Sequence, residues 1–155
     1  IIMSLECLHF ILKMKNIMRD DKKQSEEKCG PAYLKYISSS VSDELYERII
    51  RILHIEKKYR DKHYSAKKMA AELGTNTRYV SVVLRVRFHM NYTSLINKLR
   101  VEESMTLLTD RRYSKLRMQD ISDMVGFSSR QSFYNAFCRY KGVTPLHYRQ
   151  TNRIE

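Results

Sequence analysis

One order of helix starts and stops occurs twice in this chain, about fifty residues apart. Gly74 and Gly126, separated by 52 positions, each follow a short segment whose apolar residues have helical spacing. Beyond these glycines the separation becomes 53, as between Val80 and Phe133, so the second copy is expected to hold one extra residue in its turn. The other matched pairs are Leu84 with Phe137, His89 with Gly142, Asn91 with Thr144, and Tyr92 with Pro145. Two copies are too few for a solenoid, so the duplication predicts two similar helical units.

The later copy has signals for two successive helices. Ile121, Met124 and Val125 recur at the spacing of a buried face, which predicts a short amphipathic helix before the glycine. Ser128 is then the expected N-cap of the next helix, because its hydroxyl can accept a hydrogen bond from a free backbone N–H group. Gly142 supplies the positive φ with which that helix can end.

The earlier copy has the corresponding signals. Ser65 is an expected N-cap, with Tyr64 and Met69 placed to form a hydrophobic staple. Asn76 is the expected cap of the helix that follows. Between the copies, Tyr92–Thr109 has apolar residues at helical spacing. It predicts a single connecting helix about 27 Å long, at about 1.5 Å per residue.

Two helices joined by a glycine-containing turn of a few residues form a helix-turn-helix, whose second helix fits the major groove of DNA. In both copies this second helix has polar side chains opposite its apolar stripe. Arg suits guanine, Gln and Asn suit adenine, and Ser suits either. The candidates for base contacts are Thr77, Arg78 and Ser81 in the first copy and Arg130, Gln131, Tyr134 and Asn135 in the second. A solvated face of an ordinary helical bundle is the alternative interpretation.

Phosphate contacts are expected from helix N-termini and from basic side chains. Free N–H groups at a helix start attract anions, and Lys and Arg neutralise phosphates. The candidates are Asn76, Ser128 and Ser129 at the expected helix starts, and the basic residues Lys67, Lys68, Arg85 and Arg139. Each of these basic residues also fits a solvated surface.

The composition favours a polyanionic partner. The chain has 29 Lys and Arg against 17 Asp and Glu, a net charge of +12, and a sequence pI near 9.7. Of this excess, +10 lies after residue 41, which indicates a basic folded domain and not a basic tail. Three scattered cysteines indicate a reducing compartment and argue against a disulfide framework or a zinc site. No catalytic motif or glycine-rich phosphate loop is present, so neither an enzyme nor a cofactor is expected.

Residues 1–41 are expected to be an N-terminal tail or linker, disordered or partly helical, and residues 42–155 a folded domain. The first twelve residues are apolar, but Glu6 and His9 interrupt a run shorter than the about 20 apolar residues of a membrane span. An amphipathic helix, an untranslated leader and the end of a truncated span stay open, and the expected location is cytoplasmic. Ser42 is the expected cap of the first helix of the domain. The expected stripe of that helix is Leu45, Ile49, Ile52, Leu53 and Glu56.

The second unit has a long signature of fixed spacing. It consists of Ile121, Val125, Gly126, Phe127, Phe133, Phe137, Gly142, Thr144, Pro145, Tyr148 and Arg149. The first unit has the looser set Tyr79, Val80, Ser81, Phe88, Leu95, Arg100, Leu107 and Leu108. With these residues, about 70% of the chain, from about Ser42 to Arg149, resembles the DNA-binding domain of the AraC/XylS family of bacterial transcription regulators.

The resemblance implies an all-α fold of seven helices, in which one long helix joins two homeodomain-like helix-turn-helix units. The implied elements are the two units over about 65–89 and 117–141, the connecting helix over about 92–109, and a last helix over about 145–151. It also implies sequence-specific binding of double-stranded promoter DNA. The length of the connecting helix independently predicts that the two recognition helices enter successive major-groove segments, about 34 Å apart. RNA polymerase is a second candidate partner, and a monomer could supply both recognition helices, although the oligomeric state is open.

The chain departs from the family pattern at several positions. Ser104 and Ser122 stand where the family usually has Ala, and Cys138 with Arg139 replaces a pair of basic residues. His89 occupies a glycine position, where histidine is among the better tolerated residues. No small-molecule ligand domain is expected, because 41 residues cannot form a β-barrel sensor. A helical protein–protein adaptor and the DNA-binding part of a larger sensor or membrane-anchored regulator are the alternatives.

Overall fold

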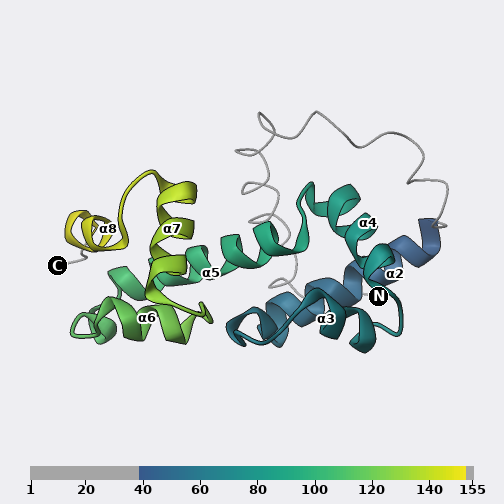
Figure 1. Cartoon of the computed structure of the whole chain (residues 1–155), viewed down its shortest axis with the longest axis horizontal. Helices are drawn as coiled ribbons and strands as arrows, with labels where there is room; N and C mark the ends of the chain where they lie inside the picture. The colour runs from purple at the N-terminus through teal and green to yellow at the C-terminus, as the bar shows by residue number, and fades with distance from the viewer. Residues whose placement is uncertain (1–38, 153–155) are drawn as a thin grey trace. The chain divides into compact units, whose positions relative to one another are not determined.

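The computed structural model describes residues 39–152, and within them the chain forms helices and no strand (Figure 1). Seven α-helices lie in this part, which confirms the expected all-α fold. Their bounds are α2 Ser39–Ile50, α3 Ala66–Glu72, α4 Thr77–Phe88, α5 Tyr92–Thr109, α6 Met118–Met124, α7 Arg130–Lys141 and α8 Pro145–Thr151. The shorter turns are the π-helical η2 Arg51–Ile55 and the 3₁₀ turns η3 Lys58–Arg60 and η4 Arg111–Tyr113.

The apolar segment 1–12 and the interpretations given to it lie outside the described residues. The same holds for most of the expected tail or linker. In the part of the chain that is described, no helix has both the length and the apolar content needed to cross a membrane.

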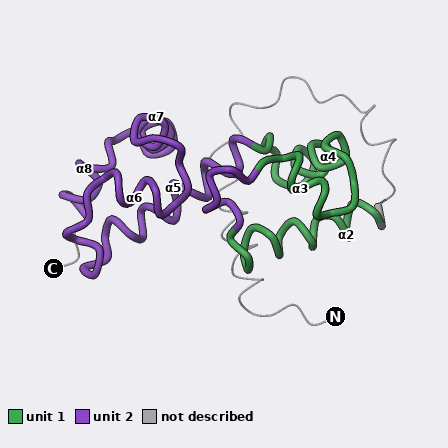
Figure 2. Tube along the Cα trace, turned by 60° about the horizontal axis from the view of Figure 1, so that its bottom comes forward, with its two compact units in different colours: residues 1–57, 65–92 green, residues 58–64, 93–155 purple. Residues whose placement is uncertain are grey.

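The described chain divides into two compact units, which are coloured separately in Figure 2. The first unit comprises residues 39–57 and 65–92 and contains α2, α3 and α4. The second comprises residues 58–64 and 93–152 and contains nearly all of α5 with α6, α7 and α8. Each unit therefore holds one of the two expected helix-turn-helix pairs.

In the first unit, α4 packs against both α2 and α3. The rings of Tyr46 on α2 and Phe88 on α4 have centroids 5.4 Å apart. Arg48 donates hydrogen bonds of 3.0 Å to the carbonyls of Leu73 and Glu72, at the C-terminal end of α3. The last carbonyls of a helix have no partner within that helix, so Arg48 serves as a C-terminal cap supplied by another element.

Two expectations for the first helix of the domain are wrong. Helix α2 begins at Ser39, so Ser42 lies inside its first turn and is not the N-cap. The sequence has several serines before Val41, and helix propensity does not select among them. Glu56 is exposed after the π-helical turn, where its carboxylate lies 4.0 Å from Arg51 Nε, because a charged group loses less hydration at the surface than in the core. The buried residues of this helix and turn are Leu45, Ile49, Ile50, Ile52 and Leu53.

The second unit has an aromatic core. Phe133 and Phe137 on α7 are fully buried, with ring centroids 5.8 Å apart. Phe127, in the turn before α7, packs on Phe133 at 5.4 Å, and Tyr148 of α8 packs on Phe137 at 5.5 Å. The Phe133–Phe137 and Phe137–Tyr148 pairs meet edge-on, which stabilises a core beyond the burial of their area, and the Phe127–Phe133 pair is tilted. The rings therefore join the turn, α7 and α8 into one packed unit.

The buried face of α6 differs from the expected one. Ile121 and Val125 are buried as predicted, but Met124 is 42% exposed. Ser122 takes the flanking position instead: it is fully buried, and its Oγ donates to the carbonyl of Ser129 at 3.3 Å. The buried face therefore follows the helical spacing of Met118, Ile121, Ser122 and Val125, and Met124 lies outside it.

A seven-residue segment between the two parts of the first unit, residues 58–64, belongs to the second unit. Arg100, which is buried on α5, donates to the carbonyls of Tyr59 at 2.6 Å and Asp61 at 3.2 Å. Arg60 forms an ion pair with Glu103, one turn further along α5. Because the buried guanidinium binds backbone carbonyls, Arg100 holds this segment against α5.

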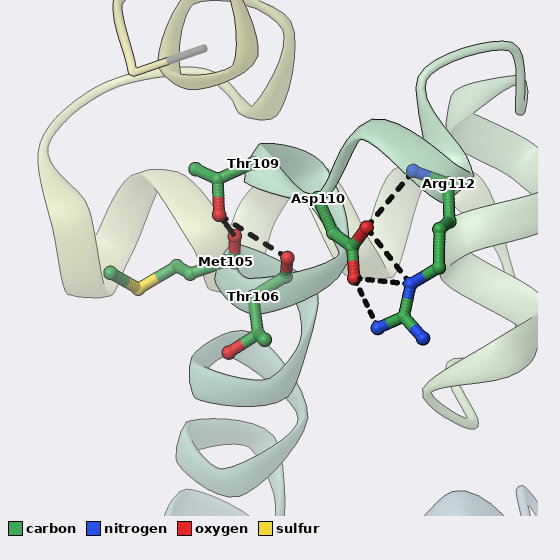
Figure 3. Close-up of polar contacts among 5 residues, drawn as sticks. All are labelled: Met105, Thr106, Thr109, Asp110 and Arg112. Atoms are coloured by element: carbon green, nitrogen blue, oxygen red, sulfur yellow. Dashed lines mark hydrogen bonds and ion pairs between the residues drawn. The ribbon is translucent and has the colours of Figure 1, made fainter. Parts of the chain in front are cut away.

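The connecting helix α5 has the expected bounds, and its C-terminal end is shown in Figure 3. Thr109 Oγ1 lies 3.1 Å from the carbonyl of Met105 and 3.2 Å from that of Thr106, so its hydroxyl bonds back to the last turn. Asp110 then accepts a hydrogen bond of 2.9 Å from the N–H of Arg112 and binds its guanidinium. These hydrogen bonds from Arg112 lower the pKa of the Asp110 carboxyl.

Candidate nucleic-acid interface

Helix α4 has one buried side and one exposed polar side. Asn76 caps it as expected, since its Oδ1 accepts a hydrogen bond of 2.9 Å from the N–H of Tyr79. His89 ends it with a φ of 53°, the left-handed conformation expected at that position. The buried residues of α4 are Val80, Val82, Val83, Leu84 and Phe88. The exposed residues on the other side include four candidate DNA contacts, Thr77, Arg78, Ser81 and Arg85.

The cap of α7 corrects the sequence-based assignment. Helix α7 starts one residue later than expected, so Ser129 is its N-cap and Ser128 lies in the turn. Ser129 Oγ accepts from the N–H of Ser132 at 3.1 Å, and Ser132 Oγ accepts from the N–H of Ser129 at 3.2 Å. This reciprocal pair resembles a capping box. Ser132 does not match the usual sequence pattern of a capping box, which has Glu or Gln at this position.

The two turns can be matched hydrogen bond by hydrogen bond. The N–H of Thr75 donates to the carbonyl of Ala70 at 2.9 Å, and the N–H of Phe127 donates to that of Ser122 at 3.0 Å. Thr75 is followed directly by the cap of α4, whereas one residue separates Phe127 from the cap of α7. Ser128 is therefore the extra residue of the second turn.

Helix α7 carries two contacts between candidate base-reading residues. The guanidinium carbon of Arg130 lies 5.1 Å from the ring centroid of Tyr134, within the range of a cation–π contact. Gln131 Nε2 donates a hydrogen bond of 2.9 Å to Asn135 Oδ1. The Tyr134 ring also meets the buried Phe133 edge-on, with centroids 6.0 Å apart. All four candidates on α7 therefore have a defined neighbour before any DNA binds.

The candidate phosphate contacts are at the surface in both units. The exposed candidates are Asn76, Lys67, Lys68 and Arg85 in the first unit and Ser128, Ser129 and Arg139 in the second. Two further basic residues are neutralised within their own unit. Arg87 forms an ion pair with Asp43, and Lys141 lies 3.0 Å from a carboxylate oxygen of Glu102.

The carboxylate of Asp120, in the first turn of α6, caps the N-terminus of that helix. Asp120 accepts from the N–H of Arg117 at 2.9 Å, and its other oxygen lies 2.9 Å from the guanidinium of the same residue. These hydrogen bonds from Arg117 lower the pKa of the Asp120 carboxyl. Among the residues with described positions, no three His, Cys, Asp or Glu side chains come together as a metal site would require.

Comparisons with known proteins agree with this arrangement. A family model described as a helix-turn-helix domain matches residues 69–151. The chain is also similar to the raffinose operon transcriptional regulatory protein RafR of Pediococcus pentosaceus, with 29% identity over 79 residues. That match covers 51% of this chain but 27% of the regulator, so the chain spans about a quarter of the length of this relative.

Two solved structures have the same fold. One is the C-terminal domain of AraT, a response regulator from Geobacillus stearothermophilus, with a TM-score of 0.62, 23% identity, and coverage of 76% of this chain and 89% of that one. The other is the C-terminal domain of the two-component response regulator yesN from Fusobacterium nucleatum, with a TM-score of 0.58, 25% identity, and coverage of 70% and 97%. The family model covers more than half of the chain. The chain therefore belongs to the AraC-type helix-turn-helix family of DNA-binding transcription regulators.

Proposed function

We propose that this chain binds double-stranded DNA sequence-specifically, with α4 and α7 each in a major-groove segment, and so regulates transcription. Each of these helices is buried on its apolar side, so its polar side faces outward. The proposed base contacts are Thr77, Arg78 and Ser81 on α4 and Arg130, Gln131, Tyr134 and Asn135 on α7. Contact with RNA polymerase and binding as a monomer stay predictions.

The ordered polar face of α7 is the observation that carries the proposal. An Arg side chain can give two hydrogen bonds to guanine, and a Gln or Asn amide can form two with adenine. Fixing one long polar side chain costs up to about 1.5–2 kcal/mol of rotamer freedom. The contacts between Arg130 and Tyr134 and between Gln131 and Asn135 already restrict these side chains, so less of this cost falls on binding.

Phosphate contacts complete the proposed interface. Asn76 and Ser129 cap helices of twelve residues, and the first N–H groups of a helix suit an anion. Lys67, Lys68, Arg85 and Arg139 are exposed and can neutralise phosphates. Ser128, now placed in the turn, stays a candidate through its hydroxyl.

Selection of bound sequences from a random duplex library tests the proposal. Enrichment of one sequence pattern by the whole chain is the expected result, and recovery of unchanged random sequence would contradict it. Arg130→Ala should then weaken binding to the selected duplex more than binding to random duplex. Lys67→Ala, the matched phosphate-contact variant, should weaken both equally and reduce the slope of log K against log salt by about 0.9.

A further inference from the structure

We infer that the second helix-turn-helix discriminates more strongly among DNA sequences than the first, which contributes mainly contacts with phosphates. The inference rests on the proposed function, because both units must bind DNA for their shares to differ. Two comparisons of matched positions carry it, one between α7 and α4 and one between α6 and α3. Positions are matched by a separation of 53 residues in the second helices and 52 in the first helices.

The second unit offers four polar side chains at its four reading positions. Arg130 contacts the Tyr134 ring, and Gln131 donates to Asn135, so that these side chains lie in two pairs along the exposed side of α7. Gln131 Oε1 and the Asn135 amide group are not used in the hydrogen bond that joins the two residues. The hydrogen bond between them thus leaves one acceptor, Gln131 Oε1, and one donor, the Asn135 amide, and the edge of adenine requires both kinds of group.

The first unit offers less at the same four positions, which hold Thr77, Arg78, Ser81 and Val82. Ser81 Oγ donates to the carbonyl of Thr77 at 2.8 Å, so its one hydroxyl proton already has an acceptor inside the helix. Val82, in the place of Asn135, is 8% exposed and has no polar group. Arg78 is the one long polar side chain of this set.

The first helices of the two units, α3 and α6, differ in basic residues, and here the first unit has more. Lys67 and Lys68 are exposed on α3, and the matched positions of α6 hold Gln119 and Asp120. Asp120 is bound to Arg117, which neutralises that arginine, whereas two lysines can neutralise two phosphates. The positive charge is therefore greater where base-reading side chains are fewer.

The test compares two double variants of the full chain. Each variant removes two exposed side chains from one turn of a recognition helix. One is Gln131→Ala with Asn135→Ala on α7, and the other is Arg78→Ala with Ser81→Ala on α4. Dissociation constants are measured by fluorescence anisotropy on the duplex selected by the wild-type chain and on random duplex of equal length, at one salt concentration. Thermal unfolding of each variant serves as the folding control.

The α7 variant is expected to lower the ratio of selected to random affinity at least tenfold, and the α4 variant less than threefold. In Lys67→Ala with Lys68→Ala, both affinities should fall together, with the salt slope reduced by about 1.8. A fall for the α4 variant as large as that for the α7 variant would overturn the inference and leave the proposed function intact. Equal affinity of the wild-type chain for both duplexes would overturn both.

Discussion

The backbone of Arg60 occupies the space that a side chain at Gly126 would need. A Cβ atom built on Gly126 would lie 2.8 Å from Arg60 Cα and closer still to its carbonyl group. Gly126 also has a φ of +94°, which disfavours any residue with a Cβ. The turn of the second helix-turn-helix therefore requires glycine for two independent reasons, its own backbone and a neighbouring one.

Gly126→Ala is expected to destabilise the chain by about 2–5 kcal/mol, because left-handed strain of about 1–2 kcal/mol adds to the cost of displacing backbone. Gly74→Ala is the matched control, since Gly74 has a φ of +66° but nothing within 4 Å of the added Cβ. It should cost about 1–2 kcal/mol. Urea unfolding of both variants measures the difference, and equal losses would show that the contact with Arg60 is not present in solution.

Ser129→Ala should destabilise the chain by about 1 kcal/mol, the usual effect of removing an N-cap hydroxyl. Ser128→Ala, one residue earlier in the turn, should change stability by less than about 0.5 kcal/mol. The free energy of unfolding of the two variants distinguishes the caps. A larger loss for Ser128→Ala would restore that residue as the cap and contradict the structure.

The stabilising contribution of Asp120 should be lost in acid. Hydrogen bonds from Arg117 lower the pKa of Asp120 in the folded state. Its stabilising contribution is therefore complete above the unfolded pKa of about 3.9 and is lost as the pH falls through the lower folded value. Asp120→Asn should reduce stability at pH 7 but have little effect near pH 2, as measured by thermal unfolding at both pH values. An equal effect at both would assign the loss to shape and not to charge.

Tyr134 is expected to act through its ring, which holds the guanidinium of Arg130. Tyr134→Ala should weaken binding to the selected duplex two- to fivefold, the equivalent of about 0.5–1 kcal/mol for an exposed cation–π contact. Tyr134→Phe keeps the ring and should bind within twofold of the wild type. If the two variants lose the same affinity, the hydroxyl is the group that matters.

Much of the fold follows from local sequence signals. Helix α5 has the expected bounds, and Ser65 and Asn76 cap α3 and α4 as predicted. His89 and Gly142 both end helices in the left-handed conformation. These features depend on residues a few positions apart, so caps, glycines and apolar spacing are sufficient to predict them.

The sequence-based predictions are wrong or silent where two residues give equivalent local signals, or where contacts between distant residues determine the structure. Two adjacent serines are equally good caps by composition, so the choice of Ser129 over Ser128 depends on the reciprocal partner Ser132. Met124 lies three residues after Ile121, but the buried residues Met118, Ile121, Ser122 and Val125 share one face of α6 and leave Met124 outside it. Binding of residues 58–64 by Arg100 joins positions about forty residues apart, which no short pattern can indicate.

Hydroxyl-radical footprinting of the whole chain on its selected duplex tests most directly whether both recognition helices bind DNA together. The proposed function predicts two protected segments with centres about one helical turn, 10–10.5 base pairs, apart. Arg78→Ala should weaken protection of one segment and Arg130→Ala that of the other. A single protected segment, or loss of the same segment in both variants, would contradict the account.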